Sequence, residues 1–402
     1  MSDTADSLIQ QESRYLFQNY GRQPIVIARG EGTRVWDVDG KEYLDFVGGL
    51  AVNVLGHCHP AVVEAVAGQV GQLIHTSNLF YTRPMIELAT LLVDNSCLDR
   101  AFFCNSGSEA VETAIKIARR WGKDDRDGAF EIISMNDAFH GRTAGALAAT
   151  GTLRYREPFE PLPEGFTHVP WNDIGAVRRA TTDRTVAVLV EPIQGEGGVN
   201  MPTPGYLKLI RGWCDERGLL LILDEIQVGI GRTGTLFAYE QEGIEPDIMC
   251  LAKGLAGGLP IGAVLASEHI AAHLVPGDHG TTFGANPVAA AAGVATLKFI
   301  EENGILAQAV RASERLKERL CSLEDRFGDV TEIRGRGLIL ALELEGDHAA
   351  DLVSACREKG LLINNVRPNA VRFLPALNVS DDEIDRACEV LGESLARIAG
   401  DN

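Results

Sequence analysis

Lys253 has the residue type and the surroundings needed for chemistry on a carbonyl compound. It follows the apolar run 248–252 and enters a glycine-rich segment, 254–258, that holds no carboxylate to pair with an ammonium group. Apolar surroundings disfavour the charged form of a lysine, so its neutral amine can act as a nucleophile and form a Schiff base. Most lysines at strand ends are solvated surface residues. The other seven lysines lie in polar turns or beside charged residues, as solvated lysines do, and Lys253 does not.

Asp224 is the second candidate for chemistry. It ends the apolar run 219–223, directly before a loop that contains several glycines. Open α/β sheets bind their ligands at the carboxyl ends of the strands, so we expect Asp224 and Lys253 at one edge of a sheet. Pyridoxal phosphate needs a lysine for its aldehyde and an acidic partner for its ring nitrogen, and this pair of residues fits both needs.

The segment after the apolar run 101–104 is a candidate anion site. It contains small residues, 105–108, and is followed at once by a helical pattern. Backbone N–H groups at a helix N-terminus, with small residues and hydroxyls beside them, suit a phosphate. An ordinary N-cap formed by Ser106 or Ser108 explains the same residues equally well.

Two further polar loops follow short apolar strands. The loop after 131–135 contains Phe139 and Arg142, and the loop after 186–190 is the glycine-rich segment 191–198. An aromatic side chain in such a loop can stack on a flat ring, although core packing is the commoner role.

Apolar strands that alternate with helical patterns predict an α/β fold with a mostly parallel, doubly wound sheet. From about residue 294 the pattern changes to that of a smaller α+β unit, and residues 25–46 alternate around the turn dipeptide Asp39-Gly40, which indicates a hairpin. We therefore expect a large cofactor-binding domain at 61–293. Residues 1–60 and 294–402 are expected to form one discontinuous small domain.

Composition narrows the possible partners. With 402 residues and a formal net charge of -19, the chain would repel nucleic acids and anionic lipids, so its ligands are expected to be small molecules. The first twenty residues are polar and the eight cysteines show no CxxC spacing, which suits a cytoplasmic protein. His57 and His59 lack a nearby carboxylate, so we expect a helix-entry turn there and no metal.

Six motifs occur in an order typical of one family and cover most of the chain. They are NSGSEA (105–110), FHGRT (139–143), EPIQGEGG (191–198), DEIQVGIGRTG (224–234), LAKGLAGGLPIGA (251–263) and GTTFGANP (280–287). Together they closely resemble the motifs of the class III, fold type I pyridoxal phosphate aminotransferases. The resemblance implies pyridoxal 5'-phosphate as cofactor and a homodimer with shared active sites.

Carried over residue by residue, the resemblance implies that Lys253 holds the cofactor and moves a proton during catalysis. Asp224 would pair with the ring nitrogen, and Gln227 would reach the ring hydroxyl. Phe139 and Ile226 would cover the two faces of the ring.

The resemblance also implies how the phosphate and the substrates are held. Gly107 and Ser108 would contact the phosphate, and Thr282 would do so across a dimer interface. Four residues would bind substrate: Arg372 as a clamp for the glutamate carboxylate, Glu196 as the movable partner of Arg372, and Arg142 with Thr281 at the acylated end of the donor. A permanent ion pair between Arg372 and Glu196 is the alternative. Ser108 and Ala285 depart from the commoner family residues without touching the chemistry.

The segments 48–60, 76–82 and 155–162 resemble the members of the class that act on acetylornithine in arginine biosynthesis. The implied reaction moves the ω-amine of N2-acetyl-L-ornithine to 2-oxoglutarate. Related ornithine-using enzymes carry a tyrosine at the position of Leu50. Succinylornithine, N-succinyl-diaminopimelate, ornithine and 4-aminobutyrate stay open as donors, and a decarboxylase or aminomutase is the rival on the same fold. A dinucleotide-dependent oxidoreductase is disfavoured because no GxGxxG motif follows the first strands.

Overall fold

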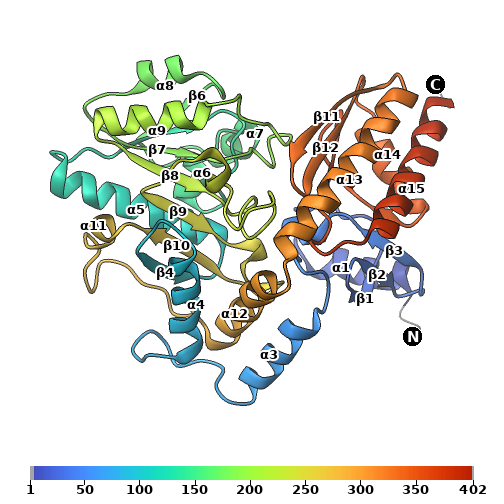
Figure 1. Cartoon of the computed structure of the whole chain (residues 1–402), viewed down its shortest axis with the longest axis horizontal. Coiled ribbons are helices and arrows are strands. Elements are labelled where there is room, and N and C mark those ends of the chain that lie inside the picture. Colours follow the sequence, from blue (N-terminus) through green and yellow to red (C-terminus); the bar gives the residue numbers. More distant parts are fainter. Residues whose placement is uncertain (1–3, 401–402) are drawn as a thin grey trace.

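The computed structural model describes residues 4–400 and contains a central seven-stranded sheet with two four-stranded sheets beside it (Figure 1). The central order is β4-β10-β9-β8-β7-β5-β6. Its strands are β4 (Arg100–Cys104), β5 (Glu131–Met135), β6 (Phe166–Val169), β7 (Thr185–Val190), β8 (Leu220–Asp224), β9 (Ile248–Leu251) and β10 (Gly262–Ala266). Strands β9, β8, β7, β5 and β6 pair in parallel, whereas β10 runs antiparallel to both β4 and β9. The predicted α/β fold with a mostly parallel sheet is confirmed.

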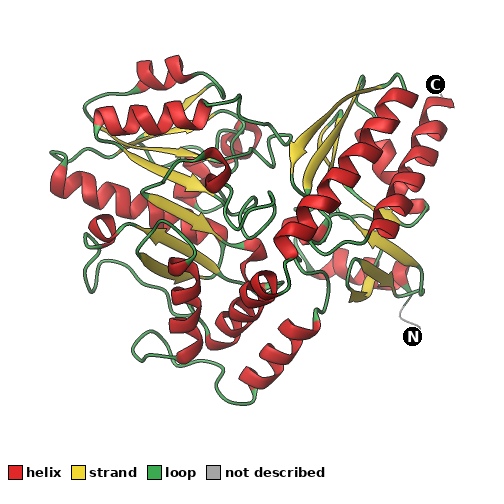
Figure 2. Ribbon diagram, in the orientation of Figure 1, coloured by secondary structure: helices red, strands yellow, loops and turns green. Residues whose placement is uncertain are grey.

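Helices cover both faces of the central sheet (Figure 2). Leu220 and Ile222 of β8 pack into the apolar cluster that includes α5, whereas Leu221 and Leu223 face the cluster that includes α9 and α12. A strand that is covered on both faces needs apolar residues at every position, which explains the continuous apolar runs in the sequence. The helices of this part are α3 (Pro60–Val70), α4 (Arg83–Asp94), α5 (Gly107–Asp125), α6 (Ala144–Ala149), α7 (Leu153–Arg156), α8 (Ile174–Ala180), α9 (Tyr206–Arg217), α10 (Tyr239–Glu242), α11 (Glu268–Ala271) and α12 (Pro287–Glu302).

One of the two smaller sheets combines residues from the two ends of the chain and has the order β1-β2-β3-β13. The other, with the order β11-β12-β15-β14, is formed by the C-terminal part alone. Their elements are β1 (Ile27–Glu31), β2 (Arg34–Asp37), β3 (Glu42–Asp45), β11 (Val330–Arg336), β12 (Ile339–Leu344), β13 (Leu361–Leu362), β14 (Asn364–Arg367), β15 (Ala370–Phe373), α1 (Ala5–Tyr15), α2 (Gly48–Ala51), α13 (Ile305–Arg326), α14 (Ala349–Glu358) and α15 (Asp381–Gly400). Leu361 of β13 pairs in parallel with Leu44 of β3. The division at 60/61 and 293/294 stays a prediction, and residue 293 lies within α12.

Local sequence patterns account for most of these elements, although helix α1 near the N-terminus and two kinds of short element were not predicted. The short strand β6 and several one-turn helices were not expected, because four to seven residues give too few positions for a periodic pattern. His59 is the N-cap of α3, so the predicted helix-entry turn is confirmed. The prediction that no carboxylate lies near His57 was wrong. Nε2 of His57 lies 2.7 Å from Oδ2 of Asp45, which is 12 residues earlier in the sequence and is brought close by the hairpin. Among residues 4–400, no helix is long and apolar enough to cross a membrane.

The contact of α5 with the sheet gives a test of this packing. A Cβ on Gly122 of α5 would meet the backbone oxygen of Ala129 and lie 2.8 Å from Cγ2 of Val186. We expect Gly122→Ala to lower the free energy of unfolding by about 1–3 kcal/mol, because overpacking forces the helix away from the sheet. Gly212→Ala in α9 is the matched control, since no atom lies within 4 Å of its Cβ position. That substitution should stabilise by about 0.5–1 kcal/mol, and equal effects in urea unfolding would contradict the packing argument.

Candidate active site

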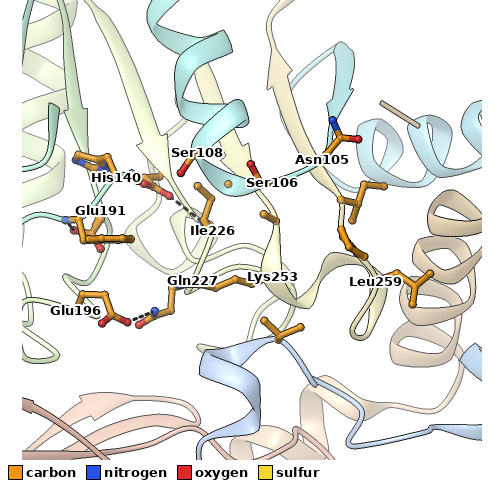
Figure 3. A pocket seen from close by; sticks show the side chains of 18 of the residues that line it. Asn105, Ser106, Ser108, His140, Glu191, Glu196, Ile226, Gln227, Lys253 and Leu259 are labelled. Atoms are coloured by element: carbon orange, nitrogen blue, oxygen red, sulfur yellow. Dashed lines mark hydrogen bonds and ion pairs between the residues drawn. The ribbon is translucent and has the colours of Figure 1, made fainter. Parts of the chain in front are cut away.

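A cavity of about 370 Å³ lies at the carboxyl ends of the central strands (Figure 3). Eight of the predicted site residues line it, namely Gly107, Ser108, Phe139, Glu196, Asp224, Ile226, Gln227 and Lys253. The other four, Arg142, Thr281, Thr282 and Arg372, are not part of its lining. A cavity of this size suits a small molecule, and the polar groups converge on it from several strand ends.

Lys253 enters the cavity from the loop that follows β9. Its φ of 40° lies in the left-handed region, which is uncommon for a residue other than glycine and is typical of functional sites. Burial lowers the pKa of Lys253, and the nearby charge of Arg372 lowers it too, while Glu196, Asp224 and Glu191 raise it. The amine is therefore more easily neutral here than in water, as the sequence predicted.

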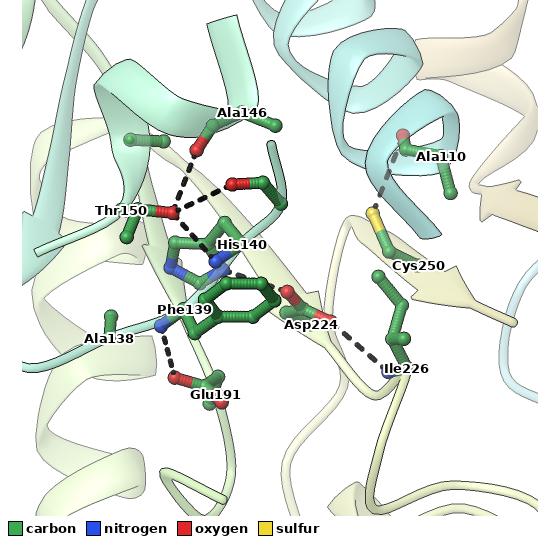
Figure 4. A network of polar contacts seen from close by, with 12 residues as sticks. Ala110, Ala138, Phe139, His140, Ala146, Thr150, Glu191, Asp224, Ile226 and Cys250 are labelled. Atoms are coloured by element: carbon green, nitrogen blue, oxygen red, sulfur yellow. Dashed lines mark hydrogen bonds and ion pairs between the residues drawn. The ribbon is translucent and has the colours of Figure 1, made fainter. Parts of the chain in front are cut away.

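Asp224 is held rigidly at the end of β8, and both of its oxygens accept hydrogen bonds. Oδ1 accepts from the backbone N–H of Ile226 at 3.1 Å, and Oδ2 lies 2.7 Å from Nδ1 of His140. His140 is completely buried, and its own backbone N–H donates to Oγ1 of Thr150 (Figure 4). Because an ionised carboxylate only accepts, the proton of this pair lies on Nδ1. The sequence analysis missed His140, although it lies next to Phe139 in the same motif.

Glu191 is a second functional candidate that the sequence analysis missed. It is buried at the end of β7, lines the cavity, and accepts a hydrogen bond from the backbone N–H of Phe139 at 3.1 Å. Burial and the nearby charge of Asp224 raise the pKa of Glu191 well above its usual value. The signal in the sequence was its place directly after a continuous apolar strand, the same signal that identified Asp224.

The start of α5 forms the third side of the cavity. Ser106 is the N-cap, because its side chain accepts from the backbone N–H of Glu109. The N–H groups of Gly107 and Ser108 belong to the first turn and precede the first intrahelical bond, so this end of α5 favours an anion. A Cβ on Gly107 would lie 3.0 Å from the side chain of Ile226, so the close approach of α5 to the loop after β8 requires a small residue.

A buried cluster formed by Glu196, Gln227 and Arg372 lies beside Lys253. Nη1 of Arg372 donates to Oε1 of Glu196 at 2.9 Å and to Oε1 of Gln227 at 2.8 Å, while Nε2 of Gln227 donates to the same Glu196 oxygen at 3.0 Å. Arg372 is fully buried, and its Nε and Nη2 have no partner among the described atoms. An unpartnered guanidinium edge is able to bind a carboxylate.

The remaining predicted residues lie around the cavity. Arg142 is exposed, and its guanidinium stacks 3.8 Å above the ring of Tyr155. Thr281 reaches the cavity only through Asn105, whose Nδ2 donates to its Oγ1 at 2.9 Å. Thr282 is exposed on the surface.

Three features of the cavity fit pyridoxal phosphate. A lysine and a carboxylate face one space, the start of an α-helix offers N–H groups for a phosphate, and Phe139 with Ile226 provides apolar surface for a flat ring. This combination defines a cofactor-dependent enzyme that acts on amines or amino acids.

Comparison with known proteins agrees with this class. A model of the class-III aminotransferases matches residues 15–395, and the chain belongs to that family. The family uses pyridoxal phosphate as its cofactor.

Relatives and solved structures resemble the chain over almost its whole length. The acetylornithine aminotransferase of Caldanaerobacter subterraneus subsp. tengcongensis is 49% identical, over 97% of this chain and 100% of that protein. An ornithine aminotransferase structure from Toxoplasma gondii has a TM-score of 0.96 at 35% identity and covers 99% of this chain and 96% of its own. The N-acetylornithine aminotransferase structure from Stenotrophomonas maltophilia has a TM-score of 0.85 at 37% identity, with 98% and 100% covered.

The ion pair between Glu196 and Arg372 predicts a dependence of stability on pH. Burial alone would raise the pKa of Glu196, but Arg372 and Lys253 together lower it to about 2. A carboxylate whose folded pKa is depressed stabilises the protein above its unfolded pKa, and this stabilisation disappears as the pH falls through about 2. We expect Glu196→Gln to cost on the order of 2–3 kcal/mol at neutral pH in the cofactor-free protein.

Urea unfolding between about pH 6 and about pH 3 measures this effect. The difference in the free energy of unfolding between Glu196→Gln and wild type should narrow as the pH falls. Exposed Glu64 supplies the control, since Glu64→Gln should change the stability by no more than about 0.5 kcal/mol. A gap that is constant over this pH range would contradict the assignment.

Proposed function

We propose that the chain transfers the ω-amine of N2-acetyl-L-ornithine to 2-oxoglutarate, giving N-acetylglutamate 5-semialdehyde and L-glutamate in arginine biosynthesis. The observation that carries the proposal is the shared cavity of Lys253 and Asp224 in a member of this family. The names of the full-length relatives support the choice of donor. The eight free cysteines suit a reducing compartment, and we place the enzyme in the cytoplasm.

Pyridoxal phosphate supplies an aldehyde that receives the amino group and a conjugated ring that takes up the electrons of a broken C–H bond. Lys253 would hold the cofactor through its Nζ, and the same amine, once free, would serve as the base that takes the proton from the substrate carbon. Its lowered pKa keeps the amine ready to accept that proton.

Asp224 keeps the ring nitrogen protonated in this proposal. Its position is supported by the N–H of Ile226 and by Nδ1 of His140, so the carboxylate cannot rotate away. His140 acts through Asp224 and is a positioning residue. Gln227 would reach the ring hydroxyl, and Phe139 and Ile226 would exclude water from the two faces of the ring.

Gly107 and Ser108 at the start of α5 would hold the phosphate, together with Thr282 of the partner protomer. A homodimer is supported by exposed apolar side chains in two loops that are joined by hydrogen bonds. Leu79 and Phe283 are exposed by 85% and 58%, and Asn78 joins their two loops through hydrogen bonds to the backbone oxygens of residues 281 and 284. Large apolar side chains that are exposed close together favour a protein interface.

The substrate residues must accept two unlike ligands at one place. Glutamate carries a carboxylate beside the reacting amine, whereas the ω-carbon of acetylornithine does not. Glu196 neutralises Arg372 while acetylornithine is bound and moves aside when the glutamate carboxylate pairs with the unpartnered edge of Arg372. Arg142 and Thr281 hold the acylated amino acid end of the donor.

Ornithine is the second candidate donor, because the fold of the Toxoplasma gondii ornithine aminotransferase superposes on this chain with a TM-score of 0.96. A half-reaction screen of acetylornithine, ornithine, succinylornithine, N-succinyl-diaminopimelate and 4-aminobutyrate against the bound cofactor distinguishes the donors. Fastest turnover with any donor other than acetylornithine would overturn the proposal.

Lys253→Ala tests the centre of the mechanism. We expect a folded protein without the visible absorption of lysine-bound cofactor and with transamination reduced by several orders of magnitude, because both the attachment point and the proton carrier are lost. Lys208→Ala, on an exposed position of α9, should leave the spectrum and the turnover unchanged. Turnover of Lys253→Ala within a few-fold of wild type would remove Lys253 from the mechanism.

Arg372→Ala and Arg142→Ala test the substrate residues. Arg372→Ala should slow the glutamate half-reaction by about a hundredfold and the acetylornithine half-reaction far less, because only glutamate needs the carboxylate clamp. Arg142→Ala should mainly raise the KM for acetylornithine, whereas Arg154→Ala, which also removes an arginine from the ring of Tyr155, should not. Stopped-flow measurement of each half-reaction decides the matter, and equal losses in both halves for Arg372→Ala would favour a permanent ion pair.

A further inference from the structure

A cluster of two histidines and two aspartates lies at the protein surface, among the helices that cover the central sheet. Asp124 and Asp125 belong to the last turn of α5, and His269 and His273 lie on α11 and in the turn after it. The cavity residues lie at the opposite end of α5, and Figure 1 shows α11 beside the end that carries the aspartates. None of these four side chains has a role in the proposed reaction.

Three ligand atoms of this cluster converge. One each from Asp125, His269 and His273 lie within 4.8 Å of one another. Nε2 of His273 is 3.3 Å from Oδ2 of Asp125, and Nε2 of His269 is 4.0 Å from the same oxygen. Bonds of 2.0–2.1 Å in a tetrahedral zinc site place neighbouring ligand atoms about 3.3 Å apart. One edge already has this length, and the exposed side chain of His269 can shorten the other by a small rotation.

Asp124 orients His273 for this purpose. Its Oδ2 lies 3.1 Å from Nδ1 of His273 and also accepts from Nε of Arg120 at 2.9 Å. Because the carboxylate accepts, Nδ1 carries the proton and the lone pair of Nε2 faces Asp125 and His269. A histidine that donates from one nitrogen to a carboxylate and offers the other to a metal is the usual arrangement in zinc proteins.

The ligand types select among cations. Two imidazole nitrogens and one carboxylate suit Zn²⁺ and similar divalent transition ions, whereas Mg²⁺ and Ca²⁺ prefer oxygen alone. His269 lies on α11 and His273 in the turn that follows it, and the centroids of their two rings are 5.6 Å apart. The neighbouring Arg120 is occupied by Asp124 and by Asp278, and its charge does not face Asp125 in any ion pair of the described residues.

We propose that Asp125, His269 and His273 form a Zn²⁺ site, with water as the fourth ligand, that fastens α11 to the end of α5. The alternative is a set of surface ion pairs in which a doubly protonated His273 bridges the two aspartates. Such a set would bind no metal with measurable preference.

Titration of the chelator-treated holoenzyme with Zn²⁺ and, separately, with Mg²⁺ in a calorimeter tests the site. We expect wild type to bind one equivalent of Zn²⁺ per chain. In both His269→Ala and His273→Ala this binding should be lost, or its affinity should fall at least about tenfold. His348→Ala is the matched control, since His348 is also exposed and lies 3.8 Å from an aspartate, Asp351. His348→Ala should bind Zn²⁺ with the affinity of the wild type, and the separate titration with Mg²⁺ should show no binding to either protein.

Thermal unfolding of the same proteins adds a second measurement. Zn²⁺ should raise the Tm of wild type and of His348→Ala but not of the two site variants, because only a folded site binds the ion. His269 is 70% exposed, so His269→Ala is expected to keep the fold and the transaminase turnover. No Zn²⁺ binding by wild type, or identical isotherms for wild type and His269→Ala, would overturn the proposal.

Discussion

The structure depends on keeping charged groups buried at the carboxyl ends of β7, β8 and β9. Removing one isolated charge from water costs several kcal/mol, and this region contains Glu191, Asp224, Lys253 and Arg372 within one connected set. The cost is offset by pairing and by hydrogen bonds from neighbouring groups: His140 and a backbone N–H for Asp224, and Glu196 with Gln227 for Arg372. Burial and the charge of Asp224 raise the pKa of Glu191, so the neutral form of its carboxyl group is favoured there.

This requirement explains why residues far apart in the sequence meet at one place. Arg372 on β15 pairs with Glu196 in the loop after β7, 176 residues earlier in the chain. Asp224 pairs with His140, 84 residues earlier. A parallel sheet brings the ends of successive strands to one edge, and its covered faces keep water away from the charges. The burial that disfavours the ammonium form of Lys253 therefore comes from the scaffold as well as from its apolar neighbours in sequence.

The sequence alone predicted the features that a local pattern determines. Continuous apolar runs marked the buried strands, and Asp224 and Lys253 stood out because each ends such a run. His140 could not be found this way, since its importance comes from a contact with Asp224 that only the fold creates. The antiparallel direction of β10 was equally hidden, because a buried strand has the same apolar pattern in either direction. The motif resemblance identified Arg372, and its two unpartnered nitrogens became visible only with the buried cluster in place.

The two ends of α5 show how one helix can serve two kinds of charge. The dipole of a helix places partial positive charge at its start and partial negative charge at its end. Gly107 and Ser108 at the start therefore suit an anion without any cationic side chain. At the other end, Asp124 and Asp125 add negative charge where the dipole already disfavours it, so cations beside this end stabilise it. Arg120 supplies part of that positive charge, and a bound divalent cation would supply more while tying α11 to the helix that carries the anion site.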